Sequence, residues 1–180
     1  MNLSRRIAWL LLLLAVVLAC ASASRFDLSG GVLVPKERVV YDDGDTFTFD
    51  DTTVRILGID TPEIAHPEHG FLEDQPYGRE AAKRAEELLR GAKEIVIFPY
   101  QEDQYGRLLA HVLIDGEHFG VKMIEEGLAY ETVSHYGDNG FPQFAEALLQ
   151  AAENGPAPAF TPPHEWRREH RVERAPTGTD

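Results

Sequence analysis

Cysteine is almost missing from this chain, which has a single copy, Cys20, among 180 residues. A disulfide needs two cysteines, so no disulfide within the chain can stabilise its fold. The zinc motif HExxH is also missing, and the seven histidines follow no strong zinc spacing. We therefore expect His66 and His69 to be solvated loop residues, and His111 to be packed or hydrogen-bonded in a strand.

Positive charge is scarce as well, with 17 Lys and Arg against 30 Asp and Glu. Without residues 1–20 the balance is 15 against 30, a net charge of −15. A protein that binds nucleic acid tightly usually carries clustered positive charge, and a field of this sign repels a polyanion at low salt. The balance argues against high-affinity duplex binding, so any phosphate must be held locally by a cation or by individual arginines.

The N-terminus has one long apolar run, Ile7–Ala19, which follows Arg5 and Arg6. It is shorter than the roughly 20 apolar residues that a membrane-spanning helix needs. Basic residues, an apolar run and then small residues predict a secretory signal peptide over residues 1–23, and hence export.

The one cysteine closes the sequence Val17-Leu18-Ala19-Cys20, which resembles a bacterial lipobox. In such a motif the cysteine becomes lipidated, so Cys20 is a candidate lipid anchor to the cell envelope. The sequence Ala21-Ser22-Ala23 offers ordinary cleavage and secretion instead, and both alternatives remain open.

The central part of the chain has short strand patterns, rich in β-branched and aromatic residues and separated by turn dipeptides. We predict five strands, at Val39–Tyr41, Thr46–Phe49, Thr53–Leu57, Glu94–Phe98 and Arg107–Ile114. Apolar positions at helical spacing predict three helices, at Arg79–Arg90, Phe119–Glu126 and Phe141–Glu153. The order predicts an α+β, mainly β fold, a small five-stranded barrel with about three helices.

Composition divides the rest of the chain into an irregular leader at 24–35, one domain at 36–154 and a Pro-rich, charged tail at 155–180. We expect the tail to be a linker with a disordered end. Its basic run Trp166–Arg171 is either a local contact for anionic lipid or nucleic acid, or a solvated stretch with one turn of helix.

Four short polar motifs follow one another within the domain: Asp43-Gly44-Asp45-Thr46, then Arg55, then Asp60-Thr61-Pro62-Glu63, and last Asp103-Gln104-Tyr105-Gly106-Arg107. Carboxylate oxygens bind hard divalent cations, and the planar fork of arginine matches phosphate oxygens two at a time. Together they indicate metal-assisted phosphoryl chemistry, and we expect a phosphodiesterase.

The same motifs in the same order resemble the staphylococcal nuclease (thermonuclease) family, over roughly residues 39–130. The resemblance implies an OB-fold-like barrel and a Ca²⁺-dependent nuclease that hydrolyses DNA or RNA, preferring single strands. It also implies that Asp45, Asp60 and the carbonyl of Thr61 are the calcium ligands. We expect a monomer.

The resemblance also assigns catalytic roles. It makes Glu63 the candidate general base, while Arg55 and Arg107 clamp the scissile phosphate, with Arg107 nearer the leaving oxygen. From the residues alone, Glu63 can also be a helix-start acid, and Arg55 can face outward from its strand. Asp43-Gly44 can likewise be ordinary turn chemistry.

Three further residues, Tyr105, Asp103 and Tyr130, are candidate substrate contacts by resemblance. The chain departs from the family at Gln104, where a lysine is usual, and at Val133, where an aromatic is usual; Tyr136 is an alternative aromatic. The other functional class that remains is a catalytically inactive OB-type module that binds nucleic acid or protein at the cell envelope.

Overall fold

The computed structural model describes residues 29–172. The predicted signal peptide, Cys20 and residues 173–180 lie outside this range. Within it, no helix combines the length and the apolar composition needed to cross a membrane.

The main sheet contains seven strands in the order β1-β6-β7-β4-β3-β2, with β8 paired to β7. Its strands are β1 (Val32–Leu33), β2 (Val39–Tyr41), β3 (Thr46–Phe49), β4 (Thr52–Ile56), β6 (Ile95–Glu102), β7 (Leu108–Ile114) and β8 (Glu117–His118). All neighbours are antiparallel except β4 and β7, which run parallel. A separate pair joins β5 (Ile59–Asp60) to β9 (Tyr130–Glu131).

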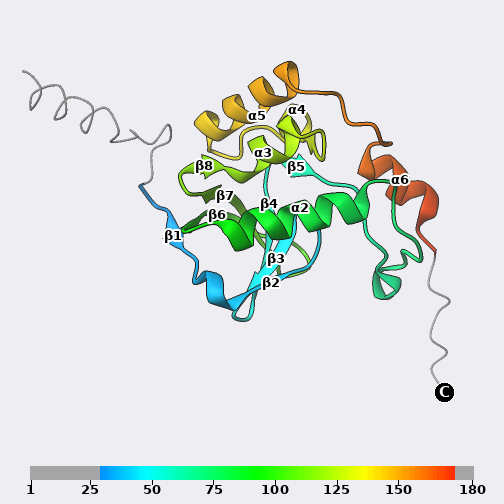
Figure 1. Ribbon diagram of the computed structural model, residues 1–180, viewed down its shortest axis with the longest axis horizontal. Coiled ribbons are helices and arrows are strands. Elements are labelled where there is room, and N and C mark those ends of the chain that lie inside the picture. The colour runs from blue at the N-terminus through cyan, green and yellow to red at the C-terminus, as the bar shows by residue number, and fades with distance from the viewer. Residues whose placement is uncertain (1–28, 173–180) are drawn as a thin grey trace, which may run out of the picture.

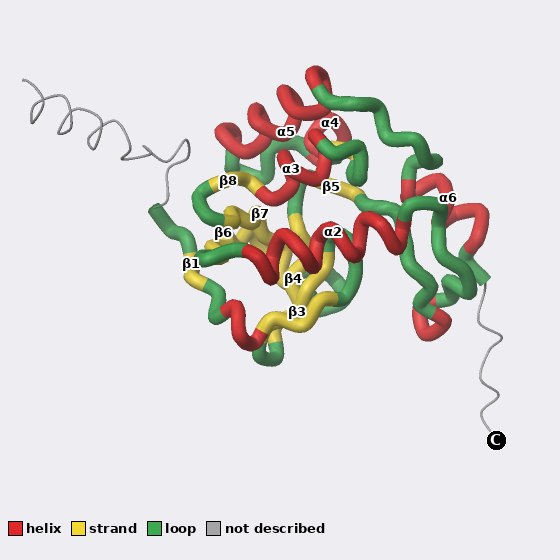
Figure 2. The backbone as a smooth tube through the Cα atoms, in the orientation of Figure 1, coloured by secondary structure: helices red, strands yellow, loops and turns green. Residues whose placement is uncertain are grey.

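The sheet curls into a half-barrel around the core, and five helices pack around it (Figure 1). They are α2 (Gly78–Gly91), α3 (Phe119–Glu125), α4 (Val133–Tyr136), α5 (Pro142–Asn154) and α6 (Pro163–His170), besides two 3-10 turns at Lys36–Arg38 and Pro67–His69. Figure 2 shows α2 running along the sheet, with α3, α4 and α5 gathered together at the top. This is the α+β, OB-like fold that the sequence predicts.

Helix α2 owes its position to small apolar residues on one face. Ala81, Ala85 and Leu89 are buried at helical spacing, whereas charged residues occupy the opposite face. Alanine side chains allow the helix axis to lie close to the sheet, whose buried residues include Phe47 and Ile56. The helix therefore forms one wall of the core.

The five predicted strands and three predicted helices are all present, with ends that differ from the predicted ones by at most four residues. Most of the elements that the sequence did not predict are the strands β1, β5, β8 and β9. Each has only two residues, too few to show an alternating pattern. The strand β1 lies inside the predicted irregular leader, where Val32 pairs with Ile97 of β6.

The predicted disordered tail is wrong for residues 155–172. Helix α6 begins with Pro163 in its first turn, where a missing N–H removes no hydrogen bond from the helix. Its buried residues are Pro163 and Trp166, three positions apart, and the Trp166 ring lies 5.9 Å from that of Phe71. The prolines therefore start a helix here instead of preventing one.

The prediction for His111 is confirmed: it is buried in β7 and contacts His118, with 3.1 Å between His111 Nδ1 and His118 Nε2. Their rings lie beside that of Phe144. Burial lowers the pKa of His111 to about 4, and burial together with the nearby His111 lowers that of His118.

This pair predicts loss of stability in acid. Because the unfolded chain, with histidine pKa near 6.5, takes up protons before the folded one, stability is full above that pH and falls below it. His111 alone should cost about 3 kcal/mol of unfolding free energy between pH 6.5 and 4. Urea unfolding at several pH values measures this loss.

The control is a variant with His111→Asn and His118→Asn, compared with His135→Asn at an exposed position. The double variant should lose most of the pH dependence in this window, and His135→Asn should keep it. Burial raises the pKa of Asp42, Asp43 and Glu63, so these groups favour the folded state as the pH falls. All the variants share them, so they do not affect the comparison. An equal slope in the double variant would contradict the assignment to the pair.

Candidate active site

The fold brings Asp45 and Asp60 together at one end of the sheet. Asp45 directly precedes β3, whose first residue Thr46 pairs with Arg55 of β4, and Asp60 lies in β5 just after the turn that ends β4. Both carboxylates are buried, with 1% and 5% of each residue exposed. A buried carboxylate requires a partner, so this end of the sheet must also supply positive charge or hydrogen bonds.

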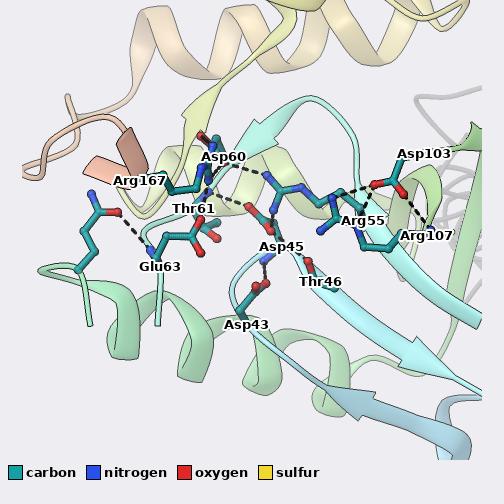
Figure 3. A network of polar contacts seen from close by, with 11 residues as sticks. Asp43, Asp45, Thr46, Arg55, Asp60, Thr61, Glu63, Asp103, Arg107 and Arg167 are labelled. Atoms are coloured by element: carbon teal, nitrogen blue, oxygen red, sulfur yellow. Dashed lines mark hydrogen bonds and ion pairs between the residues drawn. The ribbon is translucent and has the colours of Figure 1, made fainter. Parts of the chain in front are cut away.

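Arg55 supplies that charge. Its side chain lies on the face of β4 opposite the buried Val54 and Ile56. There its guanidinium forms ion pairs with both carboxylates, with Asp45 through Nη1 and with Asp60 Oδ1 through Nη2 at 2.9 Å. Figure 3 shows the guanidinium between the two acids. Arg55 therefore points away from the core, as one alternative had it, but it is held by two acids and is not free in solvent.

The Asp45 carboxylate is also fixed by the main chain. Its Oδ2 accepts a hydrogen bond of 2.9 Å from Thr61 N–H, and Thr46 donates to its Oδ1. Gly44 allows this close approach, because a Cβ at that position would lie 2.6 Å from Thr61 Oγ1. Asp43 does make a turn, by accepting a hydrogen bond from Asp45 N–H.

Glu63 lies beside Asp60 on the loop that leads to α2. The largest effect on its carboxyl is burial, which raises its pKa, while a hydrogen bond from Arg167 and that residue's charge oppose the rise. Its backbone N–H donates to Gln75 Oε1 over 3.2 Å, and Gln75 in turn donates to Thr161 O over 2.6 Å. Glu63 is not in a helix, so the helix-start alternative is wrong.

The position of Glu63 depends on Gly78, the first residue of α2. A Cβ at Gly78 would lie 2.1 Å from the Glu63 carbonyl oxygen. Gly78→Ala should therefore displace this loop, lower the unfolding free energy by about 1 to 3 kcal/mol and reduce any activity that needs Glu63. Chemical unfolding and a cleavage assay measure the two effects.

Gly91, at the other end of α2, is the matched control because nothing lies within 4 Å of a Cβ built there. Gly91→Ala should leave activity unchanged and stabilise by up to about 1 kcal/mol. Equal behaviour of the two variants would show that contact with Glu63 is unimportant.

Arg107 precedes β7 and is held by Asp103. Asp103 Oδ2 accepts a hydrogen bond of 2.8 Å from Arg107 Nε, and Asp103 Oδ1 accepts from the backbone N–H of Arg107 and of Tyr105. Although burial opposes the change, these bonds and the arginine's charge lower the pKa of Asp103. Tyr105 is exposed, with its ring 5.5 Å from the Arg107 guanidinium carbon.

A cleft of about 400 Å³ joins these groups. It is lined by three arginines, by Asp60 and by polar and aromatic residues of β6, α4 and the loops beside α4: Arg55, Arg107, Arg167, Tyr100, Gln101, Thr132, Tyr136 and Asn139. Tyr136, the alternative aromatic named from the sequence, is part of this lining. Tyr130 is not part of this lining; its hydroxyl donates to Phe160 O over 2.7 Å, so it holds the C-terminal segment.

Arg167 of α6 is the site residue that the sequence analysis missed. Its two terminal nitrogens donate to both oxygens of Asp60, at 3.0 and 2.9 Å, and Nη1 also donates to Glu63 Oε1 at 2.5 Å. Burial works against its charge, but these bonds and carboxylates raise the pKa of Arg167 further. The only sequence signal for Arg167 is its place beside Trp166 in a basic run. The spacing of that run does not indicate that Arg167 contacts Asp60 and Glu63.

The donor set fits a hard cation. Residues 29–172 contain no group of three or more His, Cys, Asp or Glu side chains arranged to hold a metal ion. Asp45 and Asp60 nevertheless converge on one guanidinium, which shows that the space between them accommodates positive charge. Two carboxylates with main-chain oxygen and water are the ligands that calcium prefers.

Curated relatives support a common origin. The SPbeta prophage-derived endonuclease YokF of Bacillus subtilis (strain 168) is 41% identical over 107 residues, which cover 53% of this chain and 35% of that protein. The endonuclease YncB of the same strain is 39% identical over 107 residues, 53% and 49% of the two chains. The thermonuclease of Staphylococcus intermedius is 38% identical over 92 residues, 48% and 53% of the two.

The chain thus spans between about a third and a half of the length of these relatives. The model of the family described as "Staphylococcal nuclease homologue" matches residues 53–155, more than half of the chain. Because this match covers more than half of the chain, the chain belongs to the family of staphylococcal nuclease homologues.

Proposed function

We propose that this protein is a calcium-dependent nuclease that hydrolyses phosphodiester bonds of DNA or RNA. One observation carries the proposal: Asp60 and three arginines line the same cleft, with Asp45 and Glu63 directly behind them. A phosphate in this cleft meets guanidinium groups on one side and a cation-binding pair of carboxylates on the other.

The proposed cation site consists of Asp45, Asp60 and the carbonyl of Thr61, with water completing the shell. Bound calcium would polarise a phosphate oxygen and lower the pKa of a coordinated water. The hydrogen bonds around Asp45 preorganise this site, because Thr46 and Thr61 hold the carboxylate in one orientation.

Three residues carry the proposed chemistry. Glu63 orients the attacking water and accepts its proton, and burial favours this role by raising the pKa of the carboxyl towards neutrality. Arg55 and Arg107 bind the non-bridging oxygens and stabilise the charge that develops at phosphorus. The water attacks in line, the bond to the 5′ oxygen breaks, and a 3′ phosphate remains.

The proposed substrate is a single strand or a frayed end. The chain's net charge of −13 offers no extended field for a duplex, so affinity has to come from the cleft itself. Tyr100 and Tyr136 line the cleft and are exposed, which suits stacking on a base of a flexible strand. Asp103 contributes by orienting Arg107.

The proposed location is outside the cytoplasm, as a secreted enzyme or as a lipoprotein anchored through Cys20. Residues 1–23 supply the sequence support, and calcium is plentiful outside cells. Radiolabelled palmitate and a Cys20→Ala variant distinguish the two forms, since only a lipoprotein incorporates label at Cys20.

The proposal is tested with the whole chain on single-stranded DNA and RNA, in calcium, in magnesium and in chelator. Cleavage in calcium that chelator stops is the expected result. Asp45→Asn should abolish it, whereas Asp51→Asn, at an exposed position on the β3–β4 turn, should not. A folded protein that binds calcium and either nucleic acid but cuts neither would favour the inactive binding module.

A further inference from the structure

The C-terminal helix places a positive charge inside the active site. Arg167 reaches across from α6 and holds both oxygens of Asp60 and one oxygen of Glu63 (Figure 3). A paired, two-nitrogen contact between arginine and carboxylate is among the strongest hydrogen-bonded pairs in proteins. Arg167 lies outside residues 53–155, the part of the chain that matches the family model.

This arginine is carried by an anchored element. Trp166 is buried against Phe71, and the backbone N–H of Val172 donates to Gly70 O over 3.0 Å. In Figure 1, α6 lies beside the long loop between β5 and α2, which is the loop that carries Glu63. The anchored helix therefore holds Arg167 close to Asp60 and Glu63.

Arg167 and a divalent cation need the same oxygens. Asp60 cannot give both of its oxygens to a guanidinium and also bind a metal ion in the same way, and two cations in contact repel each other. We propose that Arg167 is an internal counterion of the cation site. Its guanidinium must release Asp60 before a divalent ion binds there. This inference rests on the proposed cation site at Asp45 and Asp60.

The local charges explain where the released side chain goes. Three carboxylates (Asp45, Asp60 and Glu63) form ion pairs with the guanidinium groups of Arg55 and Arg167. Asp43 nearby also interacts with Arg55 and Glu63, so acids outnumber arginines here. A divalent ion offsets this excess of negative charge, so the acids no longer need the guanidinium of Arg167 to neutralise them. Arg167 lines the cleft with Arg55 and Arg107. Once released from Asp60, its guanidinium can therefore bind a substrate phosphate in place of the carboxylate.

The role of Arg167 depends on whether a divalent ion is bound. Without a divalent ion, Arg167 neutralises Asp60 and Glu63 and keeps the carboxylates from repelling one another. With the ion present, the same arginine becomes available to substrate. The metal and the phosphate grip are thereby coupled through one side chain.

Calcium titration by calorimetry tests this, on the whole chain without nucleic acid. Arg167→Gln should bind calcium about tenfold more tightly than the wild type, because a charge-assisted competitor has been removed. Arg168→Gln is the matched control: it removes the same charge from the next residue of α6, which is exposed and makes no ion pair that the structure records. Its dissociation constant should equal that of the wild type.

Arg167→Lys provides a second variant that keeps the charge but loses the paired contact, and its affinity should lie between those of the wild type and Arg167→Gln. Thermal unfolding confirms that each variant is folded. Equal or weaker calcium binding by Arg167→Gln would overturn the inference, since it would mean that Arg167 organises the carboxylates for the ion. If neither the wild type nor any variant binds calcium, the proposed cation site itself is wrong.

Discussion

Arg107→Gln should lower kcat for phosphodiester cleavage by about 10²- to 10³-fold, the loss expected when one preorganised donor to a developing charge is removed. Glutamine retains a polar side chain of similar reach but cannot carry the charge or offer the guanidinium fork. The residue lines the cleft with Arg55, and its ion pair with Asp103 fixes its orientation. Steady-state cleavage of a single-stranded oligonucleotide with calcium present measures kcat and KM separately.

Two controls accompany this variant. The unfolding free energy should change by less than about 1 kcal/mol, because a third of the Arg107 side chain is exposed and its pair is close to the surface. Asp103→Asn keeps the arginine but weakens its positioning, so its kcat should fall less than that of Arg107→Gln. A kcat within twofold of wild type in Arg107→Gln would remove this arginine from the mechanism.

Arg55→Gln should have the largest effect on stability. It leaves the buried Asp45 carboxylate without its only ion-pair partner among the described residues, and breaking a buried pair by removing one member costs about 3 to 5 kcal/mol. Asp60 retains Arg167, so Asp45 carries most of the loss. Urea unfolding in chelator measures the change.

The origin of this loss can be isolated with a double variant. Asp45→Asn with Arg55→Gln removes both charges, and should be more stable than Arg55→Gln alone. Saturating calcium should also restore part of the stability of Arg55→Gln, because a bound cation replaces the missing charge. An equally unstable double variant would mean that Arg55 stabilises the fold by packing and not by charge.

The barrel could be predicted because its strands carry strong local patterns. Thr46–Phe49 and Val39–Tyr41 are found with the predicted bounds, since turn dipeptides such as Asp50-Asp51 delimit them. The candidate site residues Asp45, Arg55, Asp60 and Glu63 could also be named, because they belong to motifs whose order resembles that of the family. Asp45 directly precedes one predicted strand, Arg55 lies within the next, and Asp60 follows that strand closely. Their spatial convergence follows from the hairpin and the short turn after β4.

Other features depend on contacts between distant segments, which local patterns do not encode. Arg167 meets Asp60 only because α6 folds back onto the β5–α2 loop, and the proline-rich approach to α6 is typical of a linker. Tyr130, a candidate substrate contact, donates its hydroxyl to Phe160 O in that same returning segment. Neither contact could be predicted, because the composition of residues 155–172 predicts a linker there.

The acidic composition and the proposed function are compatible because the positive charge is concentrated. Arg55, Arg107 and Arg167 line one cleft, whereas the excess of acids is spread over the whole chain. Long-range repulsion should slow association at low salt, and divalent ions should relieve it by screening. Association rates should therefore rise with moderate added salt, the reverse of the behaviour of a basic nuclease.

Sudden addition of calcium tests most directly whether these acids and arginines form a calcium-dependent phosphodiesterase site. The whole chain is mixed with excess single-stranded DNA in chelator, calcium is then added, and the products are followed over time for the wild type and for folded Glu63→Gln. We expect no cleavage before calcium, rapid cleavage by the wild type afterwards, and a rate at least about 10²-fold lower for Glu63→Gln. Cleavage that proceeds in chelator, or equally fast in Glu63→Gln, would show that the site does not work in this way.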